Sequence, residues 1–514
     1  MASTMSDGVR SKHTLDKDLA RLSEIEEATG FVARGLIAPG LGLLFLMLAA
    51  AAASIYVFGE PLAVIVIVAA AIAAYLAMNI GANDVANNVG PAVGAGAMTM
   101  VGALSIAAIF EIAGALIAGD AVVATISTGL IRSAAISDPA VLIRLMLAGL
   151  VASALWINFA TWIGAPVSTT HSIVGAVVGA GAAAAGLAAV DWPSVIMIAT
   201  IWIVAPLLGA LVAIGFLAFV KTAIIYQDDK IAAARRWIPV LIALMAGSFA
   251  SYLVTRLFAD AGWPVAAAVG LACFALTWVM SKRSISRQSQ GMENRNRSLR
   301  RLFRLPLIGS AALLSFAHGA NDVANAVGPL AAIVHAASRS EVADFVDIPL
   351  WVMVIGAFGI SCGLLLYGPK LIRVVGSEIT KLNPMRAFCV ALAVAIVVIA
   401  ASWFGMPVSS THIAVGAVFG VGFFREWYNT HSAHRRAYLQ RRRNLRAAAQ
   451  SESETEEDAE SDERPRKLPS REEIRRRRLV RRAHVTTIVT AWATTVPAAA
   501  ILAALLFAVF GAFA

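Results

Sequence analysis

Long apolar stretches recur from near the N-terminus of this chain to its C-terminal end, and they constrain its fold more than any other feature. Each comes close to the roughly 20 residues with which an α-helix crosses about 30 Å of hydrocarbon. Since 59% of the residues are hydrophobic and only 14% are charged, a soluble fold is excluded. We predict an all-α polytopic membrane protein with about 10 to 13 membrane segments. The stretches are 37–58, 62–80, 101–119, 141–163, 167–190, 194–220, 237–258, 263–280, 305–320, 350–368, 385–404, 407–423 and 486–512.

Basic residues gather in four loops, at 221–236, 281–304, 370–386 and 425–484. The positive-inside rule places all four on the cytoplasmic side, together with an N-terminal tail at 1–34 that lacks the pattern of a signal peptide. The net charge of +10 is therefore a property of loops and gives no reason to expect nucleic acid as a partner. We expect a multi-pass protein of the cytoplasmic (inner) membrane, in contact with the lipid bilayer, with its N-terminus in the cytoplasm.

Two motifs occur twice, once in each half of the chain. The sequence GANDVANNVGP at 81–91 matches GANDVANAVGP at 319–329 in ten of eleven positions, and PVSTTH at 166–171 matches PVSSTH at 407–412. With the orientation above, the two copies enter the membrane from opposite sides. This is an inverted-topology repeat, an architecture typical of secondary transporters with interrupted helices at the binding site.

The repeat divides the chain into six parts. We expect a tail at 1–34, a first membrane repeat at 35–220, connecting spans with a basic cytoplasmic loop at 221–304, a second repeat at 305–424, a charged low-complexity loop at 425–484 and a C-terminal membrane segment at 485–514. The segments that follow Pro166 and Pro407 either span the membrane or turn back as re-entrant hairpins; the sequence leaves both open.

The first motif predicts a cation site. Gly, Ala, Asn and Pro directly after an apolar span should break the helix there, and Asn and Asp supply the hard oxygen ligands that replace water around a cation. An ionised Asp inside a membrane span is costly and is functional by default, although an Asp that caps a broken helix is the structural alternative. The candidate cation ligands are Asn83, Asp84, Asn87, Asn321, Asp322 and Asn325.

The second motif predicts an anion site. Pro followed by Ser and Thr is typical of a helix start, where unpaired N–H groups and hydroxyls can bind an oxyanion, with simple helix capping as the alternative. Since neither motif contains Lys or Arg, a dianion beside the two aspartates needs accompanying cations, and symport follows. The candidate substrate ligands are Ser168, Thr169, Thr170, Ser409, Ser410 and Thr411.

Four further polar residues are candidates for proton or cation coupling. His171 and His412 could deliver protons, because histidine as a residue type titrates near physiological pH, but they are equally well explained as capping or packing residues. His318 has the same ambiguity with weaker support. Glu111 is a lone acid in an apolar run whose counterpart in the second half is Gly359, so it breaks the two-fold symmetry. A buried, hydrogen-bonded structural Glu is the alternative.

These residues are similar to those of a known family. The sequences GANDVANNVGPAVGAGA and GANDVANAVGP, with PVSTTH and PVSSTH, resemble the duplicated signature of the PiT inorganic phosphate transporters over about residues 37 to 423. The resemblance implies phosphate uptake coupled to Na⁺ or H⁺, in some bacterial members as a metal–phosphate complex, by homodimers with elevator-like movement. It implies the substrate and cation ligands named above and a role for Glu111. The tail, the 425–484 loop and the C-terminal segment lie outside the pattern, and we assign them no transport role.

Other functions fit less well. Ser168 and His171 lie three residues apart as in a hydrolase, but no nucleophile elbow is present and the pair is duplicated, so we expect no enzyme. An anion channel is disfavoured by the aspartates, whereas a symporter of sulfate or another tetrahedral oxyanion remains the alternative. Three cysteines without metal-ligand spacing predict no structural metal, and we expect no cofactor beyond the coupling cation.

Overall fold

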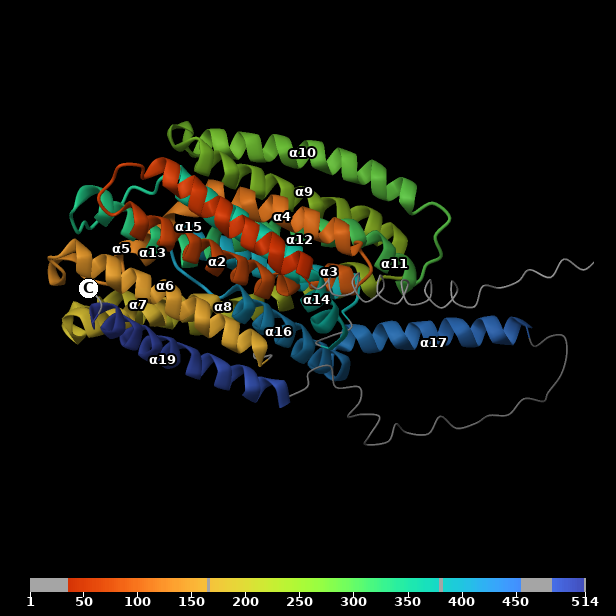
Figure 1. Cartoon of the computed structure of the whole chain (residues 1–514). Coiled ribbons are helices and arrows are strands. Elements are labelled where there is room, and N and C mark those ends of the chain that lie inside the picture. The colour runs from red at the N-terminus through yellow and green to blue at the C-terminus, as the bar shows by residue number, and fades with distance from the viewer. Residues whose placement is uncertain (1–35, 164–166, 379–381, 454–482, 513–514) are drawn as a thin grey trace, which may run out of the picture.

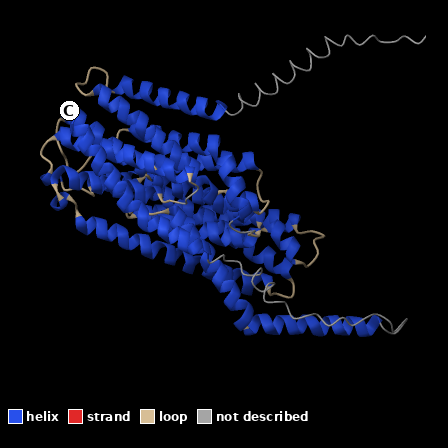
Figure 2. Ribbon diagram, turned by 60° about the horizontal axis from the view of Figure 1, so that its bottom comes forward, coloured by secondary structure: helices blue, strands red, loops and turns tan. Residues whose placement is uncertain are grey.

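The computed structural model describes residues 36–163, 167–378, 382–453 and 483–512. Within these ranges the chain is helical apart from loops and one isolated bridge between Ile131 and Val190 (Figures 1 and 2). Ten of the described helices are long and apolar enough to cross a membrane, or eleven if a bent pair at Asn296–Leu302 and Arg304–Arg339 counts as one span. The all-α membrane fold is thus confirmed, near the lower limit of the expected number of segments.

The helices follow the thirteen apolar stretches. The first half contains the helix Leu36–Tyr56, α2 (Ala63–Asn88), α3 (Gly90–Gly94), α4 (Met100–Ala118), α5 (Asp120–Thr128), α6 (Pro139–Trp162), α7 (Thr169–Ala185) and α8 (Trp192–Val220). A connecting pair, α9 (Lys230–Leu257) and α10 (Gly262–Gln288), is followed by the short α11 (Asn296–Leu302). The second half contains α12 (Arg304–Asp322), α13 (Ala324–Arg339), α14 (Leu350–Glu378), α15 (Pro384–Trp403), α16 (Ser410–His431), α17 (Ala433–Ser453) and α19 (Ala483–Ala512).

The two copies of the Asn-Asp motif lie on helices that run in opposite directions. In Figure 1, α3, which follows α2, lies at the end of the bundle where α11 leads into α12, whereas α12 leads away from that end to α13. Helix α2 packs along α14, and α12 packs along α4, so the same helix pair occurs in each orientation. This arrangement agrees with the inverted repeat that the motifs predict.

The first glycine of each Asn-Asp motif permits close helix packing. A Cβ atom on Gly81 would lie 1.9 Å from the carbonyl oxygen of Ile360, and one on Gly319 would lie 2.1 Å from that of Glu111. Small residues let membrane helices approach in this way. The contacts also align Glu111 with Ile360, so the expected counterpart, Gly359, is wrong by one position, although the asymmetry of Glu111 is unaffected.

The helices break inside both copies of the motif, as expected, although not at its first residues. Helix α2 continues to Asn88 and is interrupted at Val89, and the second copy is interrupted at Val323, between α12 and α13. Glycine costs only about 1 kcal/mol in a helix, and the close packing at Gly81 and Gly319 offsets that cost.

The C-terminal helix occupies a position that the sequence did not reveal. Helix α19 packs on α7, and α8 packs on α16, with a pair of glycines at each crossing. A Cβ on Gly179 would lie 2.2 Å from the carbonyl oxygen of Ala500, and one on Gly416 would lie 2.3 Å from that of Pro206. We infer that α19 is the second-repeat counterpart of α8, so that it supports the helix behind one of the two Ser/Thr motifs.

Candidate functional site

The Ser/Thr motifs are buried helix starts. Ser168 precedes α7 and its hydroxyl accepts from the backbone N–H of His171 at 3.2 Å, while Ser409 precedes α16 and accepts from the N–H of His412 at 3.3 Å. Helix α7 has 17 residues, too few for a full span, so it begins inside the protein. The predicted helix starts are confirmed, and the two first hydroxyls are caps.

The non-helical segment before α16 is held by the second Asn-Asp motif. The amide nitrogen of Asn321 donates to the carbonyl oxygen of Met406 at 3.0 Å and to Ser402 Oγ at 2.9 Å. Its amide oxygen accepts from the backbone N–H of Val408 at 3.0 Å. Irregular backbone at membrane depth is tolerated where protein groups satisfy it. Asn321, which we expected to bind a cation, therefore fixes the approach to the second helix start.

The Asn-Asp motif of each repeat is hydrogen-bonded to a threonine of the other repeat. Asn87 Nδ2 donates to Thr411 Oγ1 at 2.9 Å, and that hydroxyl donates to Asp84 Oδ1 at 2.8 Å. In the opposite direction, Asn325 Nδ2 lies 3.3 Å from Thr170 Oγ1, which donates to the carbonyl oxygen of Val408 at 3.0 Å. The Asn-Asp motif of each repeat thus contacts the Ser/Thr motif of the other repeat. These contacts bring the predicted cation ligands and the predicted anion ligands together in one site.

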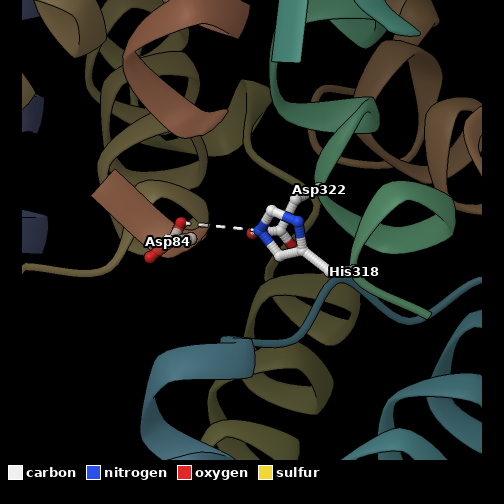
Figure 3. A group of neighbouring side chains, drawn as sticks. All are labelled: Asp84, His318 and Asp322. Atoms are coloured by element: carbon white, nitrogen blue, oxygen red, sulfur yellow. Dashed lines mark ion pairs between the residues drawn. The ribbon is translucent and has the colours of Figure 1, made fainter. Parts of the chain in front are cut away.

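The two aspartates converge on a histidine. His318 Nε2 lies 3.4 Å from Asp322 Oδ2 and 3.7 Å from Asp84 Oδ2 (Figure 3). Thr169 Oγ1 is within 3.4 Å of both carboxylates as well. The aspartates are 1% exposed and His318 is fully buried. Their ligand atoms lie within 4.8 Å of one another, a spacing suited to a bound cation.

Two further polar residues, Glu111 and Asn88, extend from the histidine side of this centre. His318 Nδ1 lies 3.2 Å from Glu111 Oε1, which also accepts from Asn88 Nδ2 at 2.9 Å. The counterparts of these three residues are Ile80 for His318, Ile360 for Glu111 and Ala326 for Asn88. The two aspartates are therefore related by the repeat, whereas His318, Glu111 and Asn88 have apolar counterparts.

Several buried oxygens of the site have no hydrogen-bond partner among the described residues. Asp322 Oδ1, Asn325 Oδ1 and Ser410 Oγ lie on the residues of the Asn-Asp and Ser/Thr motifs, and Asn88 Oδ1 and Glu111 Oε2 lie beside His318. A carboxylate oxygen and an amide oxygen are suitable ligands for a hard cation, and a hydroxyl can donate to an anion. The residues present thus fit a cation and an oxyanion bound side by side.

His171 and His412 meet each other. Their rings form an edge contact with centroids 4.4 Å apart, and His171 also packs on Trp202 at 3.8 Å. Trp202 in turn donates from Nε1 to the carbonyl oxygen of Pro407 at 3.0 Å. The pair connects the first turns of α7 and α16, which favours the packing alternative over proton delivery.

The last candidate, Asn83, lies beside the same centre. Asn83 is half-buried and donates to Asp84 Oδ1 at 3.2 Å. The sequence alone missed Asn88, although it is the single mismatch between the two motif copies, and it undervalued His318, which immediately precedes the second copy. The mismatch at Asn88 and the position of His318 are both visible in the sequence, but neither of them shows which helices are in contact.

Inverted repeats, two buried helix starts and a buried carboxylate cluster between them form an architecture typical of membrane transporters. Residues 80–503 match the model of the phosphate transporter family. The chain belongs to this family, whose members are transporters and not enzymes.

Individual relatives carry names that agree with this family. A Helicobacter pylori protein named "Putative phosphate permease" is 44% identical over 96% of this chain and 99% of its own length. A Pyrococcus abyssi protein named in the same way is 37% identical over 68% of this chain and 86% of its own. A solved structure titled "The sodium-dependent phosphate transporter" is 30% identical, covers 88% of this chain and all of its own, and superposes with a TM-score of 0.75.

Proposed function

We propose that this protein imports inorganic phosphate across the cytoplasmic membrane by symport with a cation. The observation that carries the proposal is the charge of the site: Asp84, Asp322 and Glu111 are buried together, and His318 is the one basic side chain of the described residues within ion-pair distance of them. A phosphate dianion cannot join this cluster without additional positive charge.

The size of the electrostatic repulsion between phosphate and the carboxylates supports coupling to a cation. Two unit charges 4 Å apart repel by about 4 kcal/mol even at an effective dielectric constant of about 20. The N-termini of α7 and α16 contribute only partial positive charge, about half a unit each. A cation bound with the phosphate offsets the remainder, and each ligand then raises the affinity for the other.

The contacts suggest separate roles. Asp84, Asp322, Asn87 and Asn325 present oxygens for the cation, with Asn83 and Asn321 positioning the motif and the segment before α16. Ser410 offers a hydroxyl proton to the phosphate. Thr169 and Thr411 donate to the aspartates and so link the cation side of the site to the phosphate side, and Ser168, Ser409 and Thr170 fix the helix starts. Glu111 and His318 form the proton-exchanging side of the site.

Either Na⁺ or H⁺ satisfies this scheme. The similar solved structure is of a sodium-dependent transporter, which makes sodium the first ion to test. His318 between two carboxylates supports a proton instead, since a protonated imidazole takes the place of a metal cation there.

Uptake of radiolabelled phosphate into proteoliposomes tests the proposal. Sodium and proton gradients are imposed separately, and unlabelled sulfate is added as a competitor. We expect accumulation under one of the gradients and little competition by sulfate. Accumulation of sulfate in place of phosphate would support the alternative anion, and equal flux with and without both gradients would contradict symport.

A further inference from the structure

A second cluster of charged side chains lies away from the transport site and is contributed by the C-terminal end of α8 with α15, α16 and α17. Helix α17 projects from one end of the bundle (Figure 1). The cluster centres on Lys221, the first residue of a π-helical turn, Lys221–Ile225, that follows α8. Turns of this kind are rare and are frequent at functional sites. Lys221 is only 6% exposed, an unusual position for an ammonium group.

The charged groups that act on Lys221 most strongly are basic. They are Arg425, Arg386 and Arg435, from α16, α15 and α17. None of the four bases lies within 4.0 Å of a described carboxylate, and the nearest acid in sequence, Glu426, acts on Arg425 without forming an ion pair. Four neighbouring basic side chains therefore lack the carboxylate partner that normally accompanies a buried positive charge.

Aromatic rings offset only part of this charge. Lys221 Nζ lies 4.1 Å from the ring centroid of Tyr428 and 5.2 Å from that of Phe424. These ring faces attract a cation but supply no oxygen acceptor for its N–H donors. Lys221 Nζ and the hydroxyl of Tyr428 are both buried and have no hydrogen-bond partner among the described residues.

A further hydroxyl borders the cluster. Tyr226 stacks on Tyr428 with ring centroids 5.8 Å apart, and the charge of Arg435 acts on its hydroxyl. Arg435 is itself positioned by a hydrogen bond from Nη1 to the carbonyl oxygen of Asn429 at 2.7 Å. Burial raises the pKa of Tyr226 above its usual value, against the opposing effect of Arg435, so the hydroxyl stays protonated at neutral pH. Ammonium, guanidinium and phenol groups together suit the oxygens of a phosphate group.

We propose that Lys221, Arg386, Arg425 and Arg435, with Tyr226 and Tyr428, form a binding site for a phosphomonoester or free phosphate group that is distinct from the transport site. The group comes either from an anionic lipid headgroup or from a soluble phosphate. Because α16 begins at Ser410 in the transport site and ends beside this cluster, the bound group also contacts a helix whose start binds substrate.

Binding to the purified full-length protein tests this site. One arm measures the binding of inorganic phosphate in detergent, in a Ser410→Ala background that weakens phosphate binding at the transport site. The other measures phosphatidic acid against phosphatidylcholine in nanodiscs. We expect the double variant Lys221→Gln/Arg425→Gln to lose at least tenfold affinity in one arm or in both, and the arm affected identifies the source of the phosphate group.

The matched control is Lys282→Gln/Arg283→Gln, which removes the same two charges from exposed positions on α10. Arg386→Gln and Arg435→Gln, at half-buried positions, provide second variants if the double variant does not fold. Equal binding by the cluster variants and the control, or binding by neither lipid nor phosphate to the wild-type protein, would overturn the assignment. Because every arm measures binding, the result is independent of whether transport is coupled to a cation.

Discussion

Most hydroxyls at the centre of the molecule already have a partner within the protein. Ser168 and Ser409 cap helices, Thr170 donates to a backbone carbonyl, and Thr411 donates to Asp84. Ser410 differs, because its hydroxyl is buried without a described partner at the first turn of α16. A bound anion at that helix start would be its natural acceptor.

Replacing Ser410 by Ala should weaken phosphate binding about tenfold or more, since a hydrogen bond to a charged group is worth about 1.5 to 3 kcal/mol. The measurement is the concentration of phosphate that gives half-maximal uptake. Ser153→Ala is the matched control, because that hydroxyl is also buried without a described partner, on α6. A similar change in both variants would show that Ser410 is structural.

The asymmetric residues make a separate prediction. Asn88→Ala removes the amide that donates to Glu111 and should reduce uptake about tenfold while shifting its dependence on pH, because a buried carboxylate loses a donor worth about 1 to 3 kcal/mol. Asn79→Ala, on the same helix, removes an amide nitrogen without a described partner and serves as the control. Uptake and pH dependence identical to wild type would exclude a coupling role for Asn88.

The sequence shows which residues belong to the candidate site better than it shows what each of them contacts. The duplicated motifs reveal Asp84 and Asp322 because a buried acid is costly enough to be recognisable in any membrane span. They do not reveal that Asn321 holds a backbone segment or that His318 joins Glu111 to the aspartates. Those facts depend on the rotation and depth of neighbouring helices, which apolar periodicity leaves undetermined.

Glycine pairs set the spacing of the helices around the site. Gly175 and Gly179 on α7 face the backbone of α19, and Gly416 and Gly420 on α16 face that of α8. Lipid tails provide no hydrophobic drive between helices, so close backbone contact must stabilise these pairs. Apolar length predicts every helix long and apolar enough to cross the membrane, but it predicts neither the polar helix α17, in a segment expected to be a loop, nor the exchange of partners between the repeats.

Gly179→Ala should destabilise the protein by about 1 to 3 kcal/mol, because the new Cβ would overlap the carbonyl oxygen of Ala500 unless α7 and α19 separate. A lower midpoint of thermal unfolding in detergent would show this. Gly215→Ala, on α8, is the control, since a Cβ there meets no atom within 4 Å. Equal stability of both variants would contradict tight packing of α19 on α7.

Two oppositely oriented repeats, connected through α9 to α11, bring the proposed binding residues together across one interface. Neither repeat holds a complete site, because Asp84 is bound by Thr411 of the second repeat and Asp322 lies beside Thr169 of the first. The duplicated motifs made this architecture predictable. The place of α19 was not, since a long charged insert separates it from the rest of its repeat.

Truncation before residue 483 should therefore abolish uptake, because it removes α19 from the back of α7. Replacing residues 454–482 by a Gly/Ser linker of equal length should leave uptake unchanged. Both are measured in proteoliposomes after the amount of folded protein has been matched by size-exclusion chromatography. Normal uptake by the truncated chain would show that α19 has no part in the transport site.

The most direct test of a shared anion and cation site is the affinity of the purified protein for phosphate, measured over a series of sodium concentrations and of pH values. Coupled binding predicts that one of the two cations tightens phosphate binding at least tenfold, that phosphate tightens cation binding by the same factor, and that Asp84→Asn and Asp322→Asn abolish the effect. A phosphate affinity that is unchanged across both series in a protein active in uptake would contradict it.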